Sequence, residues 1–101
     1  MVREQDASDM PDERAVVTVI GADKVGIVAA ISKVLAENNV NILDLTSSKV
    51  RDFFVMIMLI DISNSRVSLE KLKELLGAEA AKIGVQVAVQ HENIFRYMHR
   101  V

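Results

Sequence analysis

Residues 15–42, AVVTVIGADKVGIVAAISKVLAENNVNI, decide the fold, because they contain the pattern of a strand, a turn, a helix and the start of a second strand. Residues 15–20 are mostly β-branched, which favours a β-strand, and residues 21–24 interrupt it. A helix is predicted from there to about Asn38, where Asn38 and Asn39 suit a left-handed exit. Apolar residues recur at the spacing of one helical face, namely at Ile27, Ile31, Val34 and Leu35.

The remainder of the chain predicts three more strands and a second helix. The second strand begins at residues 40–42, and a shift of its apolar phase near Leu43 predicts a bulge or sharp bend. Arg51-Asp52 is expected to turn the chain into a third strand, residues 53–62. Ser68 is placed to cap the second helix, which ends at Gly84. The apolar stripe of that helix comprises Leu69, Leu72, Leu76, Ala80 and Ile83, and residues 85–90 predict the fourth strand.

The resulting order, βαββαβ, predicts a ferredoxin-like α+β sandwich, a four-stranded antiparallel sheet with two helices on one face. Residues 92–100 are expected to add a short C-terminal helix. Residues 1–14 are polar and charged, so we expect a flexible N-terminal tail followed by one domain over residues 15–101.

Composition narrows the classes of function. Lys and Arg number 12 against 14 Asp and Glu, which gives no electrostatic reason to bind nucleic acid or an anionic membrane. The sequence holds no cysteine, which excludes disulfides and thiolate metal sites. The longest apolar run, residues 53–60, is far short of the roughly 20 residues that cross a bilayer. We therefore expect a cytoplasmic protein.

The third strand is apolar at both odd and even positions, which is typical of a strand covered on both faces. Two helices cover only one face of a four-stranded sheet. The second cover is either the C-terminal helix, packing back through Phe95 and Met98, or a second subunit. Both interpretations stay open, and they can coexist.

Two places along the chain are candidates for ligand binding. In the turn after the first strand, Gly21 is expected to let the chain leave the strand, Asp23 to cap the helix, and Gly26 to let a ligand approach. The first-turn amides, from Lys24 to Gly26, suit a carboxylate or phosphate, although an ordinary capped turn has the same pattern. Asn41 can donate and accept hydrogen bonds, although a polar residue on an exposed edge strand is an equally good interpretation.

The turn Gly21-Ala22-Asp23-Lys24-Val25-Gly26-Ile27, followed after a helix by Asn39-Val40-Asn41-Ile42, resembles the ACT family of regulatory ligand-binding domains. The closing residues 92–100 resemble those of stand-alone bacterial and archaeal proteins with a single ACT domain. The resemblance implies a homodimer, in which an amino acid binds between this turn of one subunit and the second strand of its neighbour. The implied ligand-binding residues are Gly21, Asp23, Lys24, Val25, Gly26, Ile27, Asn41 and Ile42.

The chain departs from the family at three positions of the turn. Many members carry Asn-Arg-Pro-Gly where this chain has Asp23-Lys24-Val25-Gly26. A carboxylate in place of the amide disfavours a ligand carboxylate at Asp23 and favours an ammonium group. The class of ligand is therefore left open.

Catalysis has little support in the sequence. His91 and His99 would lie about 80° apart on a continuous helix and match no metal-binding pattern. We expect no catalytic residue, no metal ion and no cofactor, and therefore no enzyme. The expected function is a regulatory small-molecule-binding module that acts through an effector protein. The alternatives are a purely structural dimerisation module and an RNA-binding ferredoxin-like domain.

Overall fold

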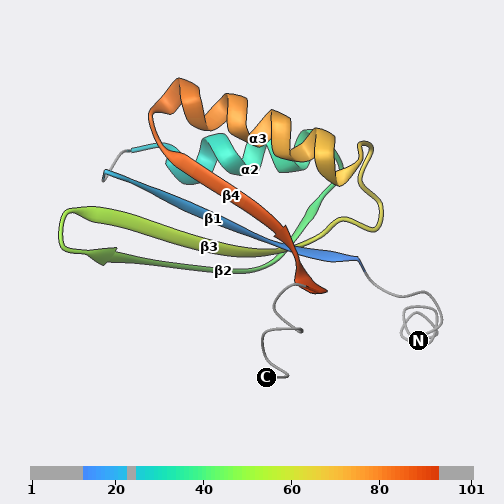
Figure 1. Cartoon of the computed structure of the whole chain (residues 1–101), viewed down its shortest axis with the longest axis horizontal. Coiled ribbons are helices and arrows are strands. Elements are labelled where there is room, and N and C mark those ends of the chain that lie inside the picture. Colours follow the sequence, from blue (N-terminus) through green and yellow to red (C-terminus); the bar gives the residue numbers. More distant parts are fainter. Residues whose placement is uncertain (1–12, 23–24, 94–101) are drawn as a thin grey trace.

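The computed structural model describes residues 13–22 and 25–93. Their order of elements is the predicted βαββαβ (Figure 1). The elements are β1 (Arg14–Ala22), α2 (Ile27–Glu37), β2 (Asn41–Val50), β3 (Phe53–Asp61), α3 (Leu69–Ile83) and β4 (Gln86–His91). Arg14, assigned to the N-terminal tail from the sequence, is the first residue of β1. Residues 1–12 of that tail and residues 94–100 of the predicted C-terminal helix lie outside the described residues.

The four strands form one antiparallel sheet in the order β2-β3-β1-β4, with β2 and β4 at its edges. Both helices lie on one face of the sheet, and the tip of the β2–β3 hairpin extends beyond them (Figure 1). The core between sheet and helices is aliphatic. Its fully buried large side chains are Ile27, Ile31, Leu35, Met56, Met58, Ile60, Leu72, Leu76, Val17 and Val19. The predicted ferredoxin-like sandwich is confirmed.

Most of the predicted turns and helix ends are also confirmed. Asn39 has φ 60, the left-handed exit predicted after the first helix, and Arg51 has φ 57 in the tight turn between β2 and β3. The register of β2 against β3 shifts between Ile42 and Asp44, where the apolar phase slips. The Ser68 hydroxyl accepts a hydrogen bond of 3.1 Å from the Lys71 amide and so caps α3.

The start of α2 differs from the prediction. Its N-cap is Gly26, with φ 92, and not Asp23. A left-handed residue at this position explains the glycine, because a β-carbon there would be strained. Asp23 and Lys24 lie outside the described residues.

Two glycines of the second helical segment lead to opposite predictions for stability. Gly77 lies inside α3, and a β-carbon at this position would meet no atom within 4 Å. Gly77→Ala is therefore expected to raise the free energy of unfolding by about 0.5–1 kcal/mol. Gly84, the C-cap of the same helix, has φ 76, so Gly84→Ala should lower it by about 1–2 kcal/mol. Urea denaturation of both variants checks the pair, and a loss of stability in Gly77→Ala would contradict it.

Candidate functional site

The turn between β1 and α2 presents backbone amides at one end of the sheet. Gly26, the N-cap of α2, has no side chain to accept hydrogen bonds from the first-turn amides, and the first turn contains no acidic residue. A β-carbon added to Gly26 would meet nothing within 4 Å, and the neighbouring Val25 is fully exposed. The first turn of α2 therefore combines the positive end of the helix dipole with open space at Gly26.

Gly21 has a different role from the predicted one. It does not end the strand, because β1 continues through Ala22. A β-carbon on Gly21 would lie 2.5 Å from Cγ1 of Val85, which precedes β4 and is buried. Gly21 is therefore a packing position, where the strand needs a residue without a side chain so that Val85 can reach the core.

Asn41 and Ile42 begin β2 at the opposite end of the sheet. Both are exposed, and Asn41 is paired in register with Asp61 of β3. Asn41 also lines a small polar cavity of about 80 Å³ together with Asn39, Asp61 and Asn64. The Asp61 carboxylate in this cavity accepts a hydrogen bond of 2.9 Å from the Ser63 amide. The end of the sheet with Asn41 thus carries amide and carboxylate groups.

The sheet register separates these two candidate regions. Asn41 pairs with Asp61, which pairs with Arg14, the first residue of β1, whereas Gly21 lies near its end. Seven residues along a strand correspond to about 23 Å. A single chain therefore does not bring Asn41 to the β1–α2 turn.

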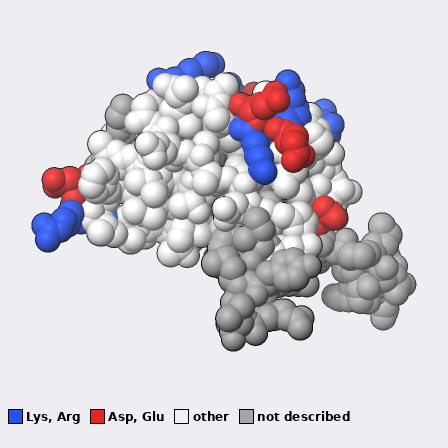
Figure 2. All heavy atoms as spheres, in the orientation of Figure 1, with Lys and Arg blue, Asp and Glu red and all other residues white. Residues whose placement is uncertain are grey.

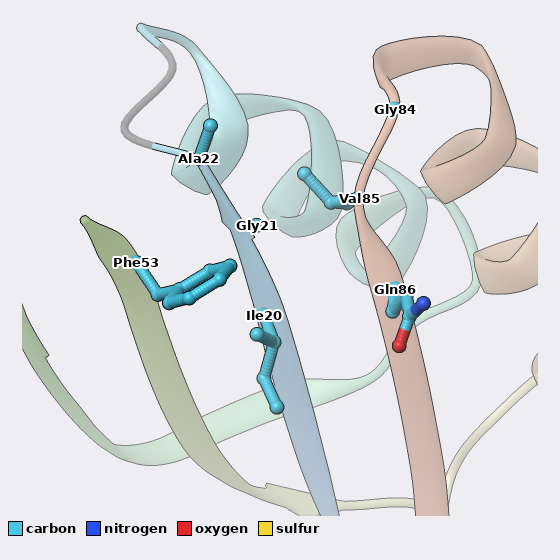
Figure 3. Close-up of a pocket in the computed structure, with 7 residues that line it drawn as sticks. All are labelled: Ile20, Gly21, Ala22, Phe53, Gly84, Val85 and Gln86. Carbon is cyan, nitrogen blue, oxygen red and sulfur yellow. The ribbon is translucent and has the colours of Figure 1, made fainter. Parts of the chain in front are cut away.

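A hollow that the sequence did not indicate lies beside Gly21. It has a volume of about 280 Å³ and lies where β1 and β3 meet the start of β4 and the end of α3 (Figure 3). Its lining residues are Ile20, Gly21, Ala22, Phe53, Gly84, Val85 and Gln86. Of these, only Gly21 was a candidate ligand-binding residue from the sequence. The others were missed because the lining comes from four elements that no local motif links. The hollow is mainly apolar and lies at the same end of the sheet as the β1–α2 turn.

β2 is the most open element of the described structure. All ten of its residues are exposed, although β2 includes several apolar side chains. Its exposed large apolar residues are Ile42, Leu43, Leu45 and Val50. In Figure 2 the charged side chains gather over the helices and at the tip of the β2–β3 hairpin, and the surface over the strands between them is mostly uncharged. An exposed edge strand of this length is a template for pairing with another strand.

The described residues contain neither a metal-binding cluster nor a membrane-spanning helix. No group of three or more His, Cys, Asp or Glu residues in this part of the chain could hold a metal ion. None of the helices in the described ranges is both long and apolar enough to cross a bilayer. The features of the described residues that suit binding are the β1–α2 turn, the β2 edge, the polar cavity at Asn41 and the apolar hollow.

Comparison with known proteins identifies the family of this chain. Residues 13–90 match the family model of the ACT domain. The chain belongs to the ACT domain family. ACT domains are regulatory ligand-binding modules, and the resemblance stated from the sequence is thereby confirmed. This ACT domain is 58% identical to a UPF0237 protein of Methanocaldococcus jannaschii over 87% of its own length and 98% of the relative.

Solved structures agree with this assignment. An ACT domain protein from Streptococcus pneumoniae has a TM-score of 0.75 at 29% identity, over 84% of this chain and 96% of that chain. The regulatory subunit of aspartate kinase from Thermus thermophilus has a TM-score of 0.60 at 20% identity, over 77% of this chain and 51% of that chain. At that identity the second structure shows the fold of the ACT domain alone.

Proposed function

We propose that this ACT domain is a regulatory, non-enzymatic module that dimerises through β2 and binds an amino acid at the dimer junction. The observation that supports the proposal most directly is the complete exposure of β2, an edge strand with apolar side chains. Pairing with a second copy would satisfy its outer backbone groups and bury these side chains. The cytoplasmic location predicted from the sequence is part of the same proposal.

Strand pairing would also bring the two candidate regions together. In an antiparallel pair of β2 strands related by a two-fold axis near their middle, the partner's Asn41 would lie close to Val50. Val50 pairs with Phe53, and Phe53 pairs with Ala22 at the end of β1. The partner's Asn41 would therefore reach the end of the sheet from which the β1–α2 turn leaves. The dimer supplies what a single chain lacks, an amide side chain near that turn.

The chemistry of this junction suits a zwitterion. The amides at the first turn of α2 favour a carboxylate, because the helix dipole and the unsatisfied N–H groups act together. The carboxylate of Asp23 would suit the ammonium group, and the partner's Asn41 can donate to one group and accept from the other. The proposed site comprises Asp23, Lys24 and the backbone of Val25, Gly26 and Ile27, with Asn41 and Ile42 from the partner. Gly21 contributes by packing against Val85 and by lining the hollow beside the turn.

The output of the module would require an effector protein. The Thermus thermophilus structure with the same fold is named as the regulatory subunit of an enzyme. We infer that this chain acts similarly, by changing its dimer stability or shape when the ligand binds. A ligand that binds only the dimer would stabilise it by linkage.

A thermal-shift screen of the full chain against amino acids and against purine and folate intermediates tests the proposal. A ligand at 100 times its dissociation constant should stabilise the protein by about 2.7 kcal/mol, which raises the melting temperature by about 10 °C or more. Asp23→Ala and Asn41→Ala should each remove most of this shift. Gln90→Ala is the matched control, because it removes an exposed side-chain amide from the opposite edge strand, β4.

The outcomes of this screen separate the alternatives. A shift that survives both Asp23→Ala and Asn41→Ala places the site elsewhere and contradicts the proposed junction. A dimer that no compound stabilises contradicts ligand binding and supports the purely structural dimerisation module. A salt-dependent shift with single-stranded RNA, absent with amino acids, would support the RNA-binding alternative.

A further inference from the structure

The face of the sheet opposite the helices carries an apolar strip along its two central strands. Residues paired across antiparallel strands point to the same face, and the register pairs Val16 with Leu59 and Ile20 with Val55. The apolar strip, defined by these four residues with Phe53 and Ile57, runs along β1 and β3, and it includes one polar position, Thr18, which pairs with Ile57. Three of its members are well exposed, Phe53 at 55%, Ile57 at 46% and Ile20 at 41%.

Most of the residues that border this apolar strip on either side are polar, the exceptions being Val50, which pairs with Phe53, and Ala88, which pairs with Thr18. On β2, Thr46 pairs with Ile57 and Ser48 with Val55. On β4, Gln86 pairs with Ile20 and Gln90 with Val16. The apolar surface is therefore about two strands, or roughly 10 Å, wide, which is the diameter of one helix.

We propose that the apolar strip is the docking site of the C-terminal segment of the same chain, residues 94–101. This inference concerns another face of the molecule than the β2 edge and does not depend on the proposed ligand or dimer. The apolar third strand predicted that either the C-terminal helix or a second subunit covers this face, and the inference selects the C-terminal segment. Three observations carry it.

The first observation is the direction in which the chain leaves β4. Arg14 precedes Val16 by two residues on β1 and so lies on the same face as the apolar strip. Its Nε atom lies 3.1 Å from Oε1 of Glu92, and the two side chains are only 32% and 23% exposed. The Asn93 amide donates a hydrogen bond of 3.1 Å to Nδ1 of His91 at the same point. The ion pair thus holds Glu92, which follows β4, on the face of the sheet opposite the helices.

The second observation is the pattern of the segment itself, IFRYMHRV. At the helical spacing of about 100° per residue, Ile94, Phe95, Met98 and Val101 share one face, whereas Arg96 and Arg100 lie on the opposite one. Eight residues of helix span about 12 Å, and the four steps from Val16 to Ile20 span about 13 Å of strand. The apolar face of the segment therefore matches the strip in width, and in length it matches the part between Val16 and Ile20.

The third observation is the size of the apolar strip. From Leu59 to Phe53 it extends about 20 Å, so that its area is on the order of 200 Å². A stable complex between separate proteins buries about 800 Å² on each partner. The strip is therefore small for a second copy, but it suffices for a segment that is tethered directly after Asn93, because the tether supplies a high effective concentration.

Disulfide trapping tests the docking directly, because the sequence holds no cysteine. The double variant Ile57→Cys/Met98→Cys should form an intramolecular disulfide under mild oxidation, to an extent independent of protein concentration. The matched control, Ile57→Cys/Arg96→Cys, places the second cysteine on the opposite face of the segment and should form the bond at least about tenfold more slowly. Mass spectrometry and non-reducing electrophoresis measure both products.

Other outcomes overturn the inference. Disulfide-linked dimers that increase with protein concentration would show that a second copy covers the apolar strip. Equal rates in the variant and its control would show that the segment does not dock in a defined orientation. As a second measurement, Phe95→Ala should increase binding of a hydrophobic dye and lower the melting temperature, whereas Arg96→Ala should change neither. If Phe95→Ala changes neither the dye binding nor the melting temperature, the docking is contradicted.

Discussion

Leu45→Lys is expected to convert the proposed dimer into a monomer, with a dissociation constant raised at least 100-fold. Leu45 is 37% exposed on the edge strand β2, where a second copy would bury it. The substitution removes apolar contact on both subunits, at about 1.5 kcal/mol or more for each, and two-fold symmetry brings the two new charges near each other. Since about 1.4 kcal/mol corresponds to a tenfold change, the combined loss exceeds two orders of magnitude.

Sedimentation velocity over a range of concentrations measures this effect, and circular dichroism checks that the fold persists. Gln90→Lys is the matched control, because it places the same charge on the exposed edge strand at the other side of the sheet. A protein that stays dimeric as Leu45→Lys but dissociates as Gln90→Lys would show that β4 forms the interface. A wild-type chain that is monomeric at high concentration would contradict the proposed function itself.

Gly21→Ala is expected to lower the free energy of unfolding by about 1–3 kcal/mol, the usual cost of overpacking a core. The added carbon would lie 2.5 Å from Cγ1 and 3.0 Å from Cβ of Val85. Val85 is only 8% exposed, so its side chain has little room to move aside. The clash would also distort the strand end that leads into the β1–α2 turn.

A double-mutant cycle with Val85→Ala measures the clash separately. Removing Cγ1 of Val85 eliminates the shortest contact, so that Gly21→Ala should cost at least about 1 kcal/mol less in the Val85→Ala background than in the wild type. Midpoints of urea denaturation for the four proteins provide the data. Additive effects would show that Gly21 is required for a reason other than Val85.

The local elements of this fold could be predicted because their signals are local. Ser68 caps α3 through an amide three residues later, and Gly84 ends the same helix in a left-handed conformation. The bulge in β2 follows from a phase slip that is visible in residues 40–45. The error at the start of α2 arose because Asp23 and Gly26 both suit a helix start, and the choice depends on the backbone angle of Gly26.

The candidate site was less accessible to sequence reasoning, because its residues come from distant parts of the chain. Gly21 looks like a turn residue until the position of Val85 is known. The hollow beside it draws its lining from β1, β3, the α3 cap and β4, and no motif joins these segments. The resemblance to the family implied a site between the β1–α2 turn and Asn41 of a neighbouring subunit, and the register places the turn and Asn41 of one chain at opposite ends of the sheet.

The sequence by itself determined the order of strands and helices, the ACT-type turn and the apolar character of β3, since each depends on residues within a few positions of one another. Only the tertiary structure decided which strand is the open edge, which face of the sheet carries the apolar strip, and that one chain cannot complete the proposed site. The physical reason is that strand order and register are set by hydrogen bonds and packing between distant segments, whereas periodicity and capping are set by neighbours along the chain.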